Sequence, residues 1–286
     1  MSELATLHPY DPAFVIRFVA AVKGDLTAGE LLPDAPAWAE REIDRVRLGY
    51  ARAETGNEAG ANAVSYGLAR LLGAVEPVYF VPGLGFTHLE AKIDRGIGML
   101  LRPPSRLFGE AGLETIAARA MPIRLDASGG GIMGGAFMPP AQLPRFRDLL
   151  EQRLDRLARR MAEAELDAPA FLGVLLEASA YAADRGLGLY EAADVVVPGV
   201  AASEPPGLRL VAPDRKRLQR DLRRRLEAAA RPPKEPGLLA RMLGRGVSTR
   251  RADDPEDGRR WRGNNDVTPP PEPMPEGPEA ISGSRE

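Results

Sequence analysis

The chain has 286 residues, 44% of them apolar, which is enough for one large domain or two small ones with a real core. It contains no cysteine, and this excludes disulfides, thiolate nucleophiles and cysteine-ligated zinc or iron–sulfur centres. The net charge of −2 conceals a strong asymmetry, because residues 1–208 carry −7, residues 209–251 carry +10 and residues 252–286 carry −5.

The first part of the chain is predicted to be mainly helical. Apolar periodicity predicts helices over residues 11–24, 36–56, 57–74, 88–101 and 110–121. Asp11 and Gly24 are typical residues for the two ends of the first helix, and Gly60 and Gly67 are expected to weaken the third. Residues 78–81 are β-branched or aromatic and predict a strand.

The second part of the chain continues this mixture. A strand is expected at 122–128, with a second one at 131–138 pairing with it. An amphipathic helix follows over 141–165, and a helix that is apolar nearly all round, over 167–186, should lie in the centre of the protein. Three valines at 195–197 indicate a short buried strand.

These elements predict a fold that is mainly α with a small sheet, either α+β or α/β, followed by a disordered C-terminal tail. We expect a globular body at 1–208, a basic amphipathic helical arm at 209–246 and a tail rich in proline and glutamate at 247–286. No apolar run is long enough to span a membrane, and the N-terminal residues lack the pattern of a signal peptide. We therefore expect a cytoplasmic protein.

A glycine-rich stretch, "DASGGGIMGGAFMPP" at 126–140, is the most unusual local feature. Part of it fits the G-x-G-x-x-G spacing of dinucleotide sites, but Pro139 and Pro140 prevent the helix that such a site needs. Two interpretations stay open. One is a flexible hairpin or a close packing of backbone, and the other is a nest of backbone N–H groups that holds a phosphate or carboxylate. The second would use residues Gly129, Gly130, Gly131, Gly134 and Gly135, with His88 or Asp126 handling a proton.

Other catalytic arrangements find little support. There is no G-x-S-x-G motif, and the chain has only two histidines, His8 and His88. His8 lies in a proline-flanked N-terminal stretch and is assigned no role. With two histidines and no cysteine we expect neither a metal site nor a cofactor, and whether the protein is an enzyme is left open.

The arm concentrates positive charge on about three helical turns. Its candidate partner-binding residues are Arg217, Arg220, Arg223, Arg224 and Arg225. The anionic partner could be the acidic body of the same chain, an acidic protein surface, nucleic acid or an anionic membrane. The leucine seam at 218, 222 and 226 packs either on the body or on another copy, so a homo-oligomer is open.

The sequence therefore favours a non-enzymatic binding or adaptor protein whose basic C-terminal helix contacts an anionic partner. The alternative is a ligand-binding or enzymatic domain that uses the glycine-rich loop at 129–135 to hold a phosphate or carboxylate group.

Overall fold

The structure, a computed structural model, describes residues 4–82, 94–119, 135–193, 195, 205–216 and 218–231. Residues Met1–Pro233 form one compact unit and Lys234–Glu286 a second. All described residues lie in the first unit, which includes the N-terminal part of the predicted arm. The described chain is mainly helical with one small mixed sheet, as the sequence predicts. The predicted tail at 247–286 lies outside the described residues.

The sheet has five strands in the order β3-β4-β1-β2-β5. The strands are β1 (Leu4–Tyr10), β2 (Val78–Pro82), β3 (Phe137–Met138), β4 (Gly188–Ala193) and β5 (Leu210–Val211). β1 lies in the middle and pairs antiparallel with both β2 and β4, while β5 pairs parallel with β2. Side chains alternate between the two faces, so both faces of the sheet need a cover of helices.

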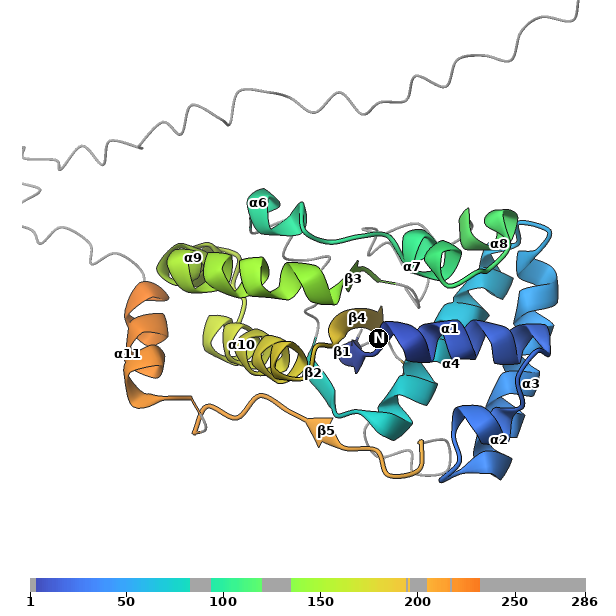
Figure 1. The fold of residues 1–286 in the computed structure, drawn as a ribbon. Coiled ribbons are helices and arrows are strands. Elements are labelled where there is room, and N and C mark those ends of the chain that lie inside the picture. The colour runs from blue at the N-terminus through green and yellow to red at the C-terminus, as the bar shows by residue number, and fades with distance from the viewer. Residues whose placement is uncertain are drawn as a thin grey trace, which may run out of the picture. The chain divides into compact units, whose positions relative to one another are not determined.

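Six helices and the sheet form the first apolar core. They are α1 (Pro12–Lys23), α2 (Ala28–Leu31), α3 (Pro36–Ala53), α4 (Glu58–Val75), α7 (Pro104–Glu110) and α8 (Thr115–Arg119). Tyr10 of β1, Phe137 of β3 and Tyr190 of β4 point into this core from the sheet. Figure 1 shows α1 to α4 gathered on one side of the strands.

The second core lies on the other side of the sheet. It includes the helices α6 (Arg95–Gly98), α9 (Leu143–Glu163), α10 (Ala168–Asp184) and α11 (Arg220–Ala229). Leu7 of β1 and Leu189 of β4 point into it. A short 3₁₀ turn, η2 (Pro140–Gln142), leads into α9. As Figure 1 shows, α9 and α10 run side by side, and α11 lies across their far ends.

Two helices on the first side, α3 and α4, approach each other unusually closely, and glycines make this possible. A Cβ atom added to Gly60 would lie 2.5 Å from the carbonyl oxygen of Gly49, and one added to Gly67 would lie 2.1 Å from Cγ2 of Val46. The sequence predicts that these glycines weaken the helix, but α4 is continuous through them. Their helix-propensity cost is offset by the close contact between the helices, with backbone at Gly60 and with the side chain of Val46 at Gly67.

Most predicted helices are confirmed, including both caps of α1. Asp11 accepts a hydrogen bond from the backbone of Ala13, and Gly24 adopts a left-handed conformation. Within the described residues, the helices predicted at 88–101 and 110–121 are formed only in part, as α6 at Arg95–Gly98 and α8 at Thr115–Arg119. Residues 83–93 and 120–134 lie outside the described residues, and with them the strand predicted at 122–128.

One strand was missed, and one predicted strand is not formed at the residue where it can be tested. β1 was not predicted at all, because Pro9 interrupts its pattern; the pairing with β2 ends at Leu7, so Pro9 has β4 alone as a neighbour. Of the strand predicted at 195–197, only Val195 lies in the described residues, and β4 ends before it at Ala193. The structure places Val195 in a bend instead.

Candidate functional site: the basic helix at the end of the α9–α10 pair

The predicted basic helix is present as α11 and is packed on the body. Leu226 is fully buried in the second core, and Leu218 and Leu222 pack against it. Leu218 comes so close to α10 that a Cβ added to Gly173 would lie 2.7 Å from its side chain. The leucine seam that the sequence left open between the body and another copy is therefore used within the chain.

Two ion pairs fasten the ends of this segment to the body. Arg225 lies 2.9 Å from the carboxylate of Asp155 on α9. Arg215 pairs with Asp167, whose other oxygen accepts a hydrogen bond from the backbone of Ala170 and so caps α10. Both pairs are about half exposed, and such pairs contribute little to stability. We infer that these pairs set the orientation of α11, while the leucine packing supplies most of the stability of the docked helix.

The outward face of α11 is different, because its charges are not all neutralised. Arg223 pairs at 2.8 Å with Glu227 one turn along the same helix, and its hydrogen bond lowers the pKa of Glu227. Arg220 and Arg224 are exposed and make no hydrogen bond or ion pair with any residue that the structure describes. Each lies about 120–160° around the helix from Leu222 and Leu226, so they point away from the core.

The predicted partner-binding residues thus divide into two groups. Arg223 and Arg225 have carboxylate partners, one on the helix and one on the body, whereas Arg220 and Arg224 have none in the described part of the chain. Arg217 lies outside the described residues. Within the described part of the chain, acidic residues of 1–208 therefore match only part of the surplus positive charge.

The glycine-rich loop can be followed only at its end. Gly129, Gly130, Gly131, Gly134, Asp126 and His88 lie outside the described residues, and Gly135 is the one candidate that can be placed. Gly135 is buried against Glu191 of β4, and a Cβ added there would lie 2.5 Å from the Glu191 carboxylate. That carboxylate also accepts a hydrogen bond from the backbone of Ala136 at 3.1 Å. The conformation of Gly135 is therefore set by packing on a buried acid.

A buried polar chain, which the sequence did not predict, crosses the middle of the sheet. The Thr6 hydroxyl donates to the carbonyl of Ala192 at 2.9 Å, so its oxygen accepts from Nε2 of His8, also at 2.9 Å. His8 is completely buried, and burial lowers its pKa to about 3. The sequence assigned His8 no role, but the structure buries it in β1 opposite Tyr190 of β4, whose hydroxyl is hydrogen-bonded to Ser65.

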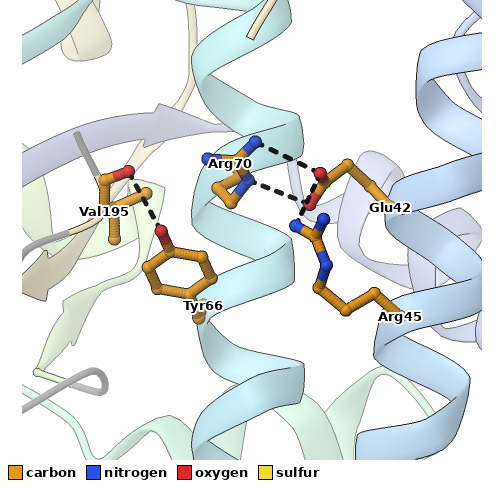
Figure 2. A network of polar contacts seen from close by, with 5 residues as sticks. All are labelled: Glu42, Arg45, Tyr66, Arg70 and Val195. Carbon is orange, nitrogen blue, oxygen red and sulfur yellow. Dashed lines mark hydrogen bonds and ion pairs between the residues drawn. The ribbon is translucent and has the colours of Figure 1, made fainter. Parts of the chain in front are cut away.

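A second buried polar group joins α3 to α4 (Figure 2). Arg70 donates two hydrogen bonds to the carboxylate of Glu42, at 2.9 and 3.1 Å, and both side chains are 4% exposed. The guanidinium also lies over the rings of Trp38 and Tyr66 at 5.8 and 5.7 Å. Burial alone would lower the pKa of Arg70, but the bonds and charge of Glu42 raise it. A guanidinium so enclosed acts as a link between helices.

Metal and membrane sites find no support in the described ranges. No group of three or more histidine, aspartate or glutamate side chains there is placed to hold a metal ion. None of the described helices is long and apolar enough to cross a bilayer.

No family model, curated protein or solved structure matches the sequence. The function is therefore argued from the arrangement of the chain's own residues.

Proposed function

We propose that this is a non-enzymatic binding protein that uses α11 to contact an anionic partner. The proposal includes the cytoplasmic location expected from the sequence. Its main support is that α11 has two different faces. Leu226, with Leu218 and Leu222, packs the helix on the body. On the opposite face, Arg220 and Arg224 are exposed and have no acidic partner among the described residues.

A docked helix suits this role for a physical reason. A ten-residue helix is marginal on its own in water, and binding to a flexible arm would cost the entropy of ordering it. Packing on α9 and α10 removes that cost before any partner arrives. It also fixes Arg220 and Arg224 one turn apart on the same side of the helix, where like charges repel until an anion neutralises them.

Arginine is the appropriate side chain for such a surface. Its planar guanidinium can bind a carboxylate or a phosphate through two parallel hydrogen bonds. The segment 209–231 contains nine arginines and lysines against three acidic residues, so the surrounding potential adds to the two unpaired charges. The expected consequence is fast, salt-sensitive association.

The alternative function, an anion site in the glycine-rich loop, gains nothing from the described part of that loop. Gly135 faces the carboxylate of Glu191, which would repel a phosphate at that point. The remaining loop glycines lie outside the described residues, and their role stays a prediction.

The test uses the full chain and immobilised heparin as a polyanion. The double variant R220E/R224E should elute at clearly lower salt than the wild type, because it loses two contacts with sulfate groups, and each lost contact weakens binding and reduces the slope of log K against log salt. A matched control is R41E/R52E on α3, which makes the same change of charge at two exposed arginines that are without partners among the described residues. Equal elution of the two variants would show that net charge, and not α11, determines retention, and would overturn the proposal.

A further inference from the structure

The described residues contain an acidic surface that complements the outward face of α11. On α9, Asp148 and Glu151 are exposed and have no ion pair or hydrogen bond within the described ranges. They lie three residues apart and share one helical face with Asp155. Asp155 already binds Arg225 of α11 at 2.9 Å. The acidic row on α9, formed by Asp155, Glu151 and Asp148, therefore begins at α11. Its last two members have no basic partner in the described residues.

The two unmatched pairs have compatible spacing. Asp148 and Glu151 are separated by three residues, and Arg220 and Arg224 by four, so each pair presents its charges about 5–6 Å apart. Within one chain the two pairs do not meet, since no ion pair joins them. A second molecule turned by a two-fold rotation would bring each basic pair onto the other molecule's acidic pair, as the self-complementary interface of a dimer requires.

The surface between the two pairs is hollowed and partly apolar. A cavity of about 370 Å³ is lined by Glu151 on the α9 side and by Gln219, next to Arg220, on the α11 side. Val174 and Leu222 contribute to its lining. A partner seated on both charged pairs would cover this cavity, adding apolar contact to the ion pairs.

From these observations we infer that the anionic partner of α11 is a second copy of this chain, which forms a weak, salt-sensitive dimer through α9 and α11. The inference rests on the proposed function and names its partner. The overall charge supports it, because a protein with a net charge of only −2 but blocks of −7 and +10 has little general repulsion to prevent self-association.

The flanking acids on α11 favour a protein partner over nucleic acid. Asp221 and Glu227 lie beside the two free arginines. A continuous phosphate backbone would be repelled by these carboxylates, whereas a protein surface can place basic residues opposite them. Residues 1–208 supply such a mixed surface, with 27 acidic and 20 basic residues.

The experiment is sedimentation equilibrium of the full chain and of two charge-reversed variants. R220E/R224E makes both surfaces acidic, and D148K/E151K makes both basic. In low salt the wild type should move from a mass of 30.8 kDa toward twice that value as its concentration rises from about 10 μM to 1 mM, and about 0.5 M salt should reverse this. Each variant alone should stay at the mass of one chain.

An equimolar mixture of the two variants should again reach the mass of two chains, because both halves of the interface are then complementary. A wild type that stays at 30.8 kDa at 1 mM in low salt overturns the inference, and so does a dimer that both variants retain. If the wild type forms no dimer but its retention on heparin still depends on Arg220 and Arg224, the inference of a second copy is wrong and the proposed function is retained. An oligonucleotide duplex that binds the wild type but not R220E/R224E, with no dimer, would replace the second copy by nucleic acid as the partner.

Discussion

His8 donates a hydrogen bond from Nε2 to the hydroxyl of Thr6, 2.9 Å away on the same buried face of β1. Because the Thr6 hydroxyl donates its only proton to Ala192, the Nε2 atom of His8 must carry a proton. Its Nδ1 is buried and has no hydrogen-bond partner among the residues that the structure describes. A proton added to Nδ1 would place a positive charge in the core of the sheet without any group to accept its hydrogen bond.

The protein should therefore lose stability in acid through this one residue. Burial lowers the folded-state pKa of His8 to about 3, against about 6.5 in the unfolded chain. The neutral ring contributes its full stability above pH 6.5, and this contribution falls by about 1.4 kcal/mol per pH unit as the pH drops from 6.5 toward 3. Urea unfolding at several pH values should show this slope in the wild type and not in H8Q.

The difference between the wild type and H8Q is the informative quantity, since acidic residues titrate similarly in both proteins. H8Q is expected to be less stable at pH 7, because it loses the packing of the ring, and relatively more stable at pH 4. Parallel curves for the two proteins between pH 7 and pH 4 would show that His8 does not carry the acid sensitivity.

The link between α3 and α4 gives a second prediction. Truncating Glu42 to alanine leaves the guanidinium of Arg70 buried without its carboxylate, and breaking a buried pair in this way costs about 3–5 kcal/mol. Glu40, exposed on the same helix, is a suitable control, and E40A should change the free energy of unfolding by less than about 0.5 kcal/mol. Chemical denaturation of both variants makes the comparison, and equal stabilities would contradict the role given to this ion pair.

The close approach of α3 and α4 gives a third. G60A should destabilise the protein by about 1–3 kcal/mol, because the new methyl group would overlap backbone atoms of Gly49 and Ala53. Gly109 in α7 has nothing within 4 Å of its Cβ position, so G109A should stabilise by about 0.4–1 kcal/mol by restricting the unfolded chain. Thermal unfolding of the two variants should shift in opposite directions, and a neutral G60A would mean that the helices can separate without cost.

The sequence predicts the helices well and the sheet poorly, for physical reasons. The stripe of Leu143, Phe146 and Leu150 on α9 is a local pattern, and it is confirmed. β1 has no such signal, since Pro9 and His8 are unusual in a strand and only the pairing with β2 and β4 favours this conformation. Strand pairing between residues 8 and 190 is a non-local property, which periodicity cannot reveal.

The sequence predicts which arginines belong to the candidate site, but not which of them face the body and which face outward. Arginine spacing alone indicates a basic helix, yet it does not determine which arginines pair with the body. Asp155 lies 70 residues from Arg225, and only the packing of Leu226 on α9 brings them together. The roles of Gly60 and Glu42 were missed for the same reason, because both act through contacts between helices.

Docking and partner binding by α11 should be separable by mutation, and this is the fourth prediction. Leu226 is fully buried, so L226A should cost about 2–5 kcal/mol and release α11 locally, because the leucine is its deepest contact with the second core. Arg224 is exposed, and R224A should change stability by less than about 0.5 kcal/mol. Limited trypsin digestion should cut L226A between 220 and 231 much faster than the wild type, while R224A is cut at the wild-type rate at its remaining sites. Equal resistance of L226A and the wild type to trypsin would show that the leucine seam does not hold α11 on the body. The ion pairs at Asp155 and Asp167 would then have to stabilise the docked helix by more than exposed pairs normally do.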